Sequence, residues 1–287
     1  MALYKTYSRR QNKNLIIRNG IITVVLLLLV ITTLFPIYYM IMSSFGEPVE
    51  AGASSYSLFI KNPTLRSYKF FFDFSKYSLR WILNSFLVAS VVTITNVIFA
   101  TTAGYAFAKL RFTGNKVIFF ILLAAMMIPY QVTQVPLYIL FVNVLKIKDT
   151  YLSLVAPSIV TVYNIFLAKQ FIGSLPTEII EAAKIEGCSQ PTLLTKIIIP
   201  LSKTVMAVMA ITTFMGSWNT FFWPFLVTST EKMQTIQVGL KNFSFRNTTY
   251  LGPMMAGATI SALPMFILFF SLQKYFLEGV TVGAVKG

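Results

Sequence analysis

Long apolar stretches without any charged side chain alternate with short charged stretches along this chain. Six windows of at least 19 residues lack Asp, Glu, Lys and Arg, and a helix needs roughly 20 apolar residues to cross about 30 Å of hydrocarbon. Each window can therefore hold one membrane span, and the pattern predicts an all-α membrane protein with six transmembrane helices. The windows are 19–46, 81–108, 117–145, 150–168, 204–230 and 247–273.

The charged residues between these windows set the bounds of the predicted segments. We expect an N-terminal segment over 1–18, a six-helix domain over 19–276 and a C-terminal tail over 277–287. A charged loop over 173–203 interrupts the domain. The spans are expected at about 19–42, 82–107, 117–140, 151–171, 204–228 and 253–275.

Basic residues predict the orientation of the spans. The first 18 residues carry five Lys or Arg and no acid, and the 109–116 loop carries three and no acid. Because basic residues beside spans stay in the cytoplasm, six spans place both termini and the 173–203 loop there. The 47–80 segment is expected outside the cell but carries five basic and three acidic residues. It therefore weakens the difference in basic residues between the two sides of the membrane.

Composition agrees with a protein of the cell membrane that crosses the bilayer several times and contacts lipid. Apolar residues make up 56% of the chain, charged residues 11%, and the mean hydropathy is +0.70. The net charge of +15 could indicate nucleic acid, but no basic stripe with interleaved aromatics lies outside the spans. The charge is better explained by lysines and arginines that flank the spans, so we expect no nucleic acid partner.

The first apolar run could also be read as a cleaved signal peptide. The run from Ile21 to Met42 exceeds the roughly 7 to 15 residues of a signal core. Its length favours a retained first span.

The chain lacks most of the side chains that carry chemistry. It has no His and a single cysteine, Cys188, which disfavours an internal disulfide, a zinc site and a Ser-His pair. None of the six windows contains an ionisable acid or base, which weakens the case for an ion-driven carrier. The sequence therefore predicts a transport protein and not an enzyme. If the protein moves a solute uphill, we expect the energy to reach it through a cytoplasmic loop.

The 173–203 loop reads as two short amphipathic helices joined by a turn. Glu178 and Glu181 place negative charge near the positive end of the first helix. Gly187 can adopt the left-handed conformation that ends a helix, and Pro191 can open the next. On periodicity alone, the loop is either a docking element or a connector lying along the membrane interface.

The spacing inside this loop separates the two readings. It follows the order EAA, three residues, G, nine residues, I, one residue, a second apolar residue and P. This pattern resembles the EAA loop of importer-type ABC permeases, and it departs only where Ile199 replaces a leucine. The matching positions are Glu181, Ala182, Ala183, Gly187, Ile197 and Pro200.

Shorter matches extend the resemblance from about residue 15 to the C-terminus. Together they are similar to the MalG-type carbohydrate permeases, and they imply the type I fold of ABC importer permeases. The matches are Asn84-Ser85, Tyr105-Ala106-Phe107, Arg111-Phe112, Pro129, Trp218-Asn219, Gly279 and Gly283-Ala284-Val285-Lys286-Gly287.

The resemblance implies a division of labour among several subunits. A chain of this family pairs with a second, MalF-type permease, binds two copies of an ABC ATPase and receives sugar from an extracellular binding protein. The EAA residues would couple the permease to the ATPase. This chain would bind no cofactor, because ATP and Mg are used by the ATPase and no GxxxxGK[ST] sequence occurs here.

Polar and aromatic residues within the spans are candidates for a substrate path. Saccharides are held by aromatic faces and by amide or hydroxyl groups, and polar groups in spans are costly. The same residues can instead anchor a span at the interface or join two helices. The candidates are Tyr130, Gln131, Gln134, Asn164, Trp218, Asn219 and Trp223.

The sequence therefore predicts half of the translocation pathway of an ATP-driven importer, with an oligosaccharide as the expected cargo. A polyol or glycerol phosphate is the alternative cargo, although spans without basic residues disfavour an anion. A different class of function is a membrane scaffold whose loop binds another partner.

Overall fold

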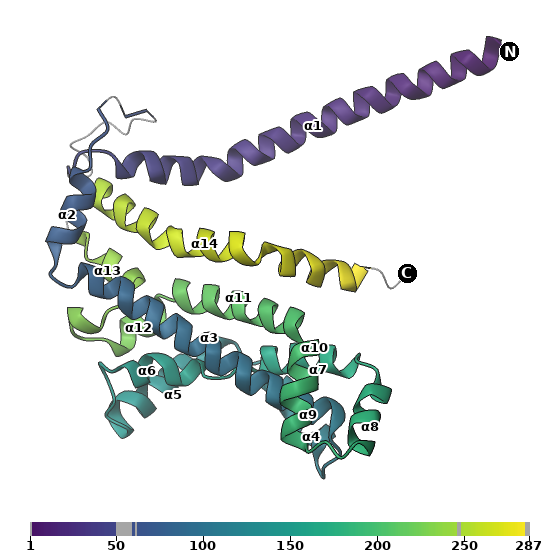
Figure 1. Ribbon diagram of the computed structural model, residues 1–287. Coiled ribbons are helices and arrows are strands. Elements are labelled where there is room, and N and C mark those ends of the chain that lie inside the picture. The colour runs from purple at the N-terminus through teal and green to yellow at the C-terminus, as the bar shows by residue number, and fades with distance from the viewer. Residues whose placement is uncertain (1, 50–58, 61, 246–247, 285–287) are drawn as a thin grey trace. The chain divides into compact units, whose positions relative to one another are not determined.

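The computed structural model describes residues 2–49, 59–60, 62–245 and 248–284 (Figure 1). The chain forms two compact units, one of residues 1–71 with 245–259 and one of residues 72–244 with 260–287. The C-terminal match Val285-Lys286-Gly287, residues 50–58 and 61 of the 47–80 segment, and residues 246–247 lie outside the described residues.

Helices make up nearly all regular structure in the described ranges, which confirms the all-α class apart from one pair of two-residue strands. The bounds are α1 Ala2–Ser44, α2 Arg66–Phe74, α3 Ser78–Lys109, α4 Asn115–Ala125, α5 Tyr130–Tyr138, η1 Ile139–Val144, α6 Tyr151–Val155, η2 Ala156–Ser158, α7 Val162–Gly173, α8 Thr177–Ile185, α9 Gln190–Leu193, η3 Leu194–Ile198, α10 Ile199–Leu201, α11 Lys203–Asn219, α12 Phe222–Val227, η4 Glu231–Met233, α13 Ile236–Lys241, β1 Ser244–Phe245, β2 Thr248–Thr249 and α14 Leu251–Ala284.

Several helices are long and apolar enough to cross a membrane. Among the described residues three pass this test alone, Arg18–Ser44 of α1, all of α3, and Leu251–Ser271 of α14. Three further pairs of helices pass together, but each pair is bent by more than 40° at a short break. The multi-pass character is thus confirmed, while the count of six spans stays a prediction because it requires each bent pair to be one span.

The predicted span over 117–140 shows the largest of these bends. It is broken into α4 and a second arm, Tyr130–Val144, that turns by 93°. Pro129 stands just before α5 with φ −58° and ψ 132°, an extended conformation that cannot continue a helix. Because proline has no N–H and its ring collides with the preceding turn, a straight helix through this point is unfavourable.

The first unit is organised around the end of α1. Ser44 Oγ lies 2.8 Å from the Tyr68 hydroxyl of α2, and Ser67 Oγ donates to the Gly46 carbonyl oxygen at 2.7 Å. The rings of Phe70 and Tyr250 lie 5.1 Å apart between centroids. These contacts tie the segment after α1 to α2 and to the residues that open α14.

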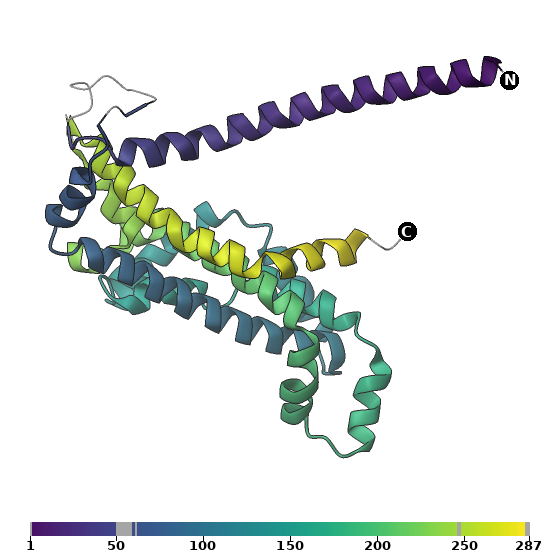
Figure 2. The ribbon, with the colours of Figure 1, turned by 45° about the horizontal axis from the view of Figure 1, so that its top comes forward.

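The second unit is built around α3, which packs along α7 and α11 (Figures 1 and 2). Helices α3 and α7 lie close together at Gly104, where an added Cβ would lie 2.5 Å from Ala168 Cβ, 2.8 Å from the Lys169 backbone nitrogen and 2.9 Å from the Ala168 carbonyl carbon. Small residues allow helix backbones to approach this closely in membranes, where packing and hydrogen bonds drive helix association. Gly104 therefore sets the distance between α3 and α7.

The Ser78 end of α3 is fastened to the segment that contains η4. Trp81 Nε1 donates to the Glu231 carbonyl oxygen at 2.8 Å. Asn84 Nδ2 donates to the carbonyl oxygens of Lys232 and Gln234 at 2.9 and 2.8 Å. Trp81 and Asn84 are both buried, so this end of α3 and the 231–234 segment form one packed body.

A carboxylate clasp joins the loop before α6 to the loop after α12. Asp149 Oδ1 accepts hydrogen bonds from the backbone N–H groups of Ser229 and Thr230 at 2.9 and 3.1 Å, and Oδ2 accepts one from Thr230 Oγ1 at 2.7 Å. Partial burial alone raises the pKa of the Asp149 carboxyl, but these hydrogen bonds and the charge of Lys148 outweigh it, so the pKa lies below its ordinary value.

We expect Asp149→Asn to lower the stability of the protein at neutral pH by about 1 kcal/mol, because the amide makes weaker hydrogen bonds than the carboxylate. Because the pKa of Asp149 is lower in the folded state than its unfolded value of about 3.9, the ionised carboxylate stabilises the folded protein above that pH. This stabilisation is lost as the pH falls through the folded-state pKa. The difference in melting temperature between wild type and variant should therefore shrink below about pH 4. Thermal unfolding in detergent from pH 7 to pH 3 measures it, with exposed Asp73→Asn as the control. A difference that is independent of pH would contradict the clasp.

Candidate functional site

Residues 173–203, the EAA loop, form a helix, a glycine turn and a second helical segment. The turn is a Schellman motif in which Cys188 N donates to the Ala183 carbonyl oxygen and Gly187 N to that of Lys184, both at 3.0 Å. Gly187 has φ +82°, in the left-handed region. Ser189 then caps α9, since its Oγ accepts from Thr192 N at 3.4 Å. The sequence prediction of two short helices joined at Gly187 is confirmed, and the second helix includes the π-helical turn η3.

One face of the EAA loop is part of the protein core. Ile180 and Ala183 of α8 are buried together with Leu193 and Ile198 of the second arm. They pack in one cluster with residues of α3, α7 and α11, and Ile197 lies partly buried against it. Because about 25 cal/mol is gained per Å² of apolar surface removed from water, this cluster fixes the loop to the helices.

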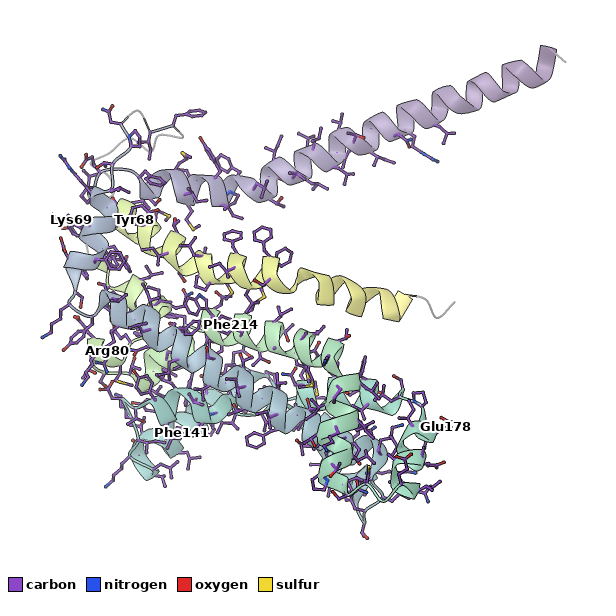
Figure 3. The ribbon with its side chains drawn as sticks, viewed as in Figure 1. Tyr68, Lys69, Arg80, Phe141, Glu178 and Phe214 are labelled. Atoms are coloured by element: carbon purple, nitrogen blue, oxygen red, sulfur yellow. The ribbon has the colours of Figure 1, made fainter. Side chains whose placement is uncertain are left out.

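The opposite face of α8 is exposed. Glu181 and Ala182 point to solvent, whereas Ala183 does not, so the two alanines of the motif have different surroundings. Ile185, which the sequence did not single out, is 88% exposed, a high value for a large apolar side chain. Figure 3 shows Glu178 on the same helix directed away from the body of the second unit. Acidic groups and an apolar side chain thus share one outward surface.

Two side chains of α3 fasten the EAA loop at both of its helices. Lys109 Nζ donates to the Leu175 carbonyl oxygen at 2.7 Å, just before α8. The Tyr105 hydroxyl donates to Gln190 Oε1 at 2.6 Å, at the start of α9. The loop therefore cannot shift far without moving the Lys109 end of α3.

A buried polar network joins α3, α7 and α11. Asn164 Nδ2 donates to Asn96 Oδ1 and to Thr213 Oγ1, both at 2.8 Å, and Asn96 Nδ2 donates to the Ser158 carbonyl oxygen at 3.1 Å. Asn164 Oδ1 is buried and has no hydrogen-bond partner. Hydrogen bonds between spans help to hold helices together in a membrane, and an unpaired buried acceptor costs about 1–3 kcal/mol.

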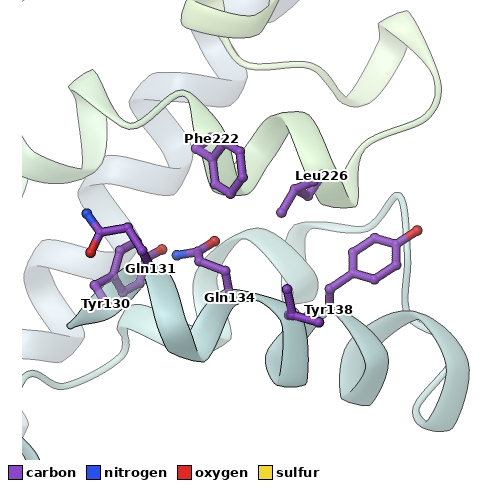
Figure 4. A pocket seen from close by; sticks show the side chains of 7 residues that line it. Tyr130, Gln131, Gln134, Tyr138, Phe222 and Leu226 are labelled. Atoms are coloured by element: carbon purple, nitrogen blue, oxygen red, sulfur yellow. The ribbon is translucent and has the colours of Figure 1, made fainter. Parts of the chain in front are cut away.

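A cavity of about 550 Å³ lies between α5 and α12 (Figure 4). We call it the aromatic cavity because three of its side chains are aromatic rings. Gln134, on α5, is 2% exposed, and neither atom of its amide has a hydrogen-bond partner. Figure 4 shows this amide directed toward Phe222 of α12. The lining residues are Tyr130, Gln131, Gln134, Val135, Tyr138, Phe222 and Leu226.

A second cavity of about 430 Å³ adjoins the first, because Tyr130 lines both. We call it the polar cavity, since most of its lining residues carry hydroxyl or amide groups. Asn164 of the buried network reaches this cavity. The lining residues are Val92, Asn96, Tyr130, Ser158, Thr161, Tyr163, Asn164, Thr212, Thr213, Gly216, Ser217 and Thr220.

The other candidates for a substrate path line neither of these two cavities. Trp218 and Trp223 are buried, and their indole N–H groups donate to the carbonyl oxygens of Ser261 and Ser153 at 3.0 and 2.8 Å. These contacts give both tryptophans a packing role. Asn219 is exposed at the end of α11.

Sequence reasoning missed the residues of α11 that line the polar cavity. Thr212, Thr213, Gly216 and Ser217 of α11 and Thr220 at its C-cap follow one another at intervals of one, three, one and three residues, which places them on one face of a helix. A face of small polar residues inside an apolar segment was the signal that could have found them. Phe222 has no comparable signal, because its place in the aromatic cavity depends on the packing of α12 against α5.

Residues 96–282, more than half of the chain, match the family described as "Binding-protein-dependent transport system inner membrane component". The chain belongs to this family. The permease is therefore a multi-pass membrane component of an ABC transport system and not an enzyme, as the sequence predicted. The matched range begins in α3 and includes the EAA loop and both cavities.

Relatives of the permease agree with this assignment. It is 32% identical to "Arabinooligosaccharides transport system permease protein AraQ" of Halalkalibacterium halodurans, over 88% of this chain and 91% of that protein. It is 31% identical to "Trehalose/maltose transport system permease protein MalG" of Thermococcus litoralis, over 91% and 94%. A crystal structure of a bacterial ABC transporter that imports the acidic polysaccharide alginate superposes with a TM-score of 0.79 at 23% identity, over 90% of this chain and 96% of that one. The fold is thus that of an ABC importer permease.

Proposed function

We propose that this permease forms half of the translocation pathway of an ATP-driven importer for an oligosaccharide. The relatives named for arabinooligosaccharides and for trehalose and maltose support a sugar as cargo. The observation that carries the ATP-driven part is the EAA loop, a rigid helix pair fixed to the core on one side and exposing Glu181, Ala182 and Ile185 on the other.

The exposed face of α8 suits docking into a groove of an ATPase subunit. An amphipathic helix binds a groove through a few apolar anchors, and Ile185 offers such an anchor. Among the described residues the one ion pair joins Arg66 and Glu47, so Glu181 has no ion-pair partner there. The Glu181 carboxylate is therefore available to a basic group of the ATPase. Gly187 gives the turn, and Ile197 and Pro200 belong to the second arm.

The proposed assembly contains a second permease of the MalF type, two copies of the ATPase and an extracellular sugar-binding protein. ATP and Mg would be used by the ATPase alone. The EAA loop and both termini would then face the cytoplasm, as the basic residues predict. Closure of the ATPase pair would move the two permeases as rigid bodies and switch the pathway between its two sides.

Reversal of one charge tests the docking role. We expect Glu181→Lys to weaken the affinity of the permease for the ATPase at least about 100-fold, because like charges placed together at an interface cost several kcal/mol. Copurification of the ATPase and sugar-stimulated ATP hydrolysis of the reconstituted complex measure this. Asp73→Lys, at an exposed acid of α2 outside the EAA loop, is the matched control and should behave as wild type.

Two outcomes would count against the proposal. A Glu181→Lys complex with wild-type ATPase content and wild-type sugar-stimulated hydrolysis would remove Glu181 from the interface. A wild-type permease that purifies without any ATPase, and whose deletion leaves sugar uptake by cells unchanged, would instead support a scaffold.

A further inference from the structure

The aromatic cavity contains a buried amide without a partner. Gln134 is 2% exposed, and its Nε2 and Oε1 both lack a hydrogen bond although the side chain is directed into the cavity (Figure 4). Polar groups on membrane spans are expensive, so an unpaired amide at this place points to a group that is bound there. The missing partner must accept one hydrogen bond and donate another, because an amide has one donor side and one acceptor side.

We propose that this permease carries its own binding site for a neutral saccharide, with Gln134 as the polar contact of one sugar ring. A sugar hydroxyl both donates and accepts, so vicinal hydroxyls can satisfy both atoms of the Gln134 amide. This inference rests on the proposed function, since it names where and how the oligosaccharide is held in this subunit.

The walls of the aromatic cavity fit the remaining surface of a sugar ring. Tyr130 and Tyr138 of α5 and Phe222 and Leu226 of α12 line the cavity (Figure 4). Small-molecule sites combine mostly apolar and aromatic walls with a few polar groups, in volumes of about 300–1,000 Å³. The cavity of about 550 Å³ has this composition, and aromatic rings can cover the C–H face of a pyranose while the amide binds its hydroxyls.

The polar cavity continues the site beyond Tyr130. Its Asn164 Oδ1 is a second buried acceptor without a partner, and hydroxyl groups of Thr213, Ser217 and Thr220 line the same space. A chain of sugar units longer than one ring can therefore contact Gln134 with one unit and the polar cavity with the next. Because Tyr130 lines both cavities, an oligosaccharide bound at Tyr130 would contact both, whereas a single small polyol would occupy only one of them.

The absence of charge in both cavities selects against anions. None of their lining residues is Asp, Glu, Lys or Arg. A phosphate or carboxylate that leaves water needs charged or multiple N–H partners, which this lining does not provide. The two cavities should thus bind neutral sugars and exclude glycerol phosphate.

Equilibrium dialysis tests the site without the binding protein. The purified permease–ATPase complex in detergent is dialysed against radiolabelled arabinotriose, maltotriose or sn-glycerol 3-phosphate at millimolar concentrations. We expect saturable binding of at least one of the two sugars and no binding of glycerol phosphate. Gln134→Leu should weaken sugar binding about tenfold, the effect of about one or two lost hydrogen bonds.

The melting temperature separates a binding role from a structural one. Replacing an unpaired buried amide by an apolar side chain of similar size leaves stability unchanged or raises it. Gln134→Leu should therefore melt no lower than wild type while it binds sugar more weakly. The control is Gln170→Leu, at an exposed glutamine of α7 outside both cavities, which should bind as wild type.

The site would be refuted if Gln134→Leu bound sugar with wild-type affinity, if glycerol phosphate bound as well as the sugars, or if neither sugar bound. Sugar uptake by cells that contain the wild-type importer is measured in parallel. If cells with the wild-type importer take up sugar and any of these three results is found, the site in this subunit is refuted but the proposed function stands. If cells that lack this permease take up sugar as well as cells that contain it, both are refuted.

Discussion

Gly187→Pro should abolish transport while the permease remains inserted in the membrane. Gly187 has φ +82°, and its N–H donates to the Lys184 carbonyl oxygen in the turn of the EAA loop. Proline fixes φ near −65° and has no N–H, so it can neither adopt the conformation nor make the hydrogen bond. The turn would open, and α8 would no longer present Glu181 and Ile185 in their place. We expect uptake and sugar-stimulated ATP hydrolysis below about a hundredth of wild type, since a docking defect of a few kcal/mol is a factor of at least 100.

A graded series at the same position separates backbone conformation from the loss of a particular residue. Nothing lies within 4 Å of a Cβ added at Gly187, so space does not limit the substitution. Asn adopts the left-handed region more readily than other non-glycine residues. Gly187→Asn should therefore transport nearly as wild type and Gly187→Ala should fall between Asn and Pro. Equal loss in all three variants would show that the side chain, and not the left-handed turn, decides the effect.

Gly104→Ala should destabilise the second unit more than the same substitution at Gly173 or Gly187, where nothing lies within 4 Å of an added Cβ. The new Cβ would meet the backbone of α7 at Ala168 and Lys169, and a backbone cannot turn away as a flexible side chain can. Overpacking of a core typically costs about 1–3 kcal/mol, and a clash with backbone lies at the upper end of that range or above it. Helices α3 and α7 would have to separate, which weakens the contacts of the Asn164 network between them.

Yield of monodisperse protein in detergent and the melting temperature measure this effect. Gly173→Ala is the control, because Gly173 ends α7 and nothing lies within 4 Å of its added Cβ. Alanine is also the better helix former, so the control should melt at or above the wild-type temperature. Equal melting temperatures for Gly104→Ala and wild type would mean that α3 and α7 are not as close as the structure places them.

The sequence predicted the parts of the fold that follow from local pattern. Windows without charge located the apolar helices, since a charged side chain is costly in hydrocarbon. Gly187 and Pro191 located the turn and the start of the second helix of the EAA loop, because both act within a few residues. The 93° bend at Pro129 could not be predicted in size, since a proline permits a range of angles and packing selects one of them.

Some residues of the candidate sites could likewise be predicted from local sequence, and others depend on how the helices pack. Glu181 and Gly187 were found from spacing along the chain alone. The burial of Ala183 and the exposure of Ala182 depend on which side of α8 meets the core, and that is decided by α3 and α7. Gln134 was a candidate by its residue type, but its unpaired amide follows from the packing of α5 against α12, and no local pattern contains that information.

The attachment of α3 at both ends has a mechanical consequence. The helix has 32 residues and is therefore about 48 Å long, more than the about 30 Å of hydrocarbon that a membrane contains. One end grips the EAA loop through Tyr105 and Lys109, and the other grips the segment after Thr230 through Trp81 and Asn84. Because the helix is continuous, a displacement of the EAA loop at one end of α3 would also displace the 231–234 segment at the other end.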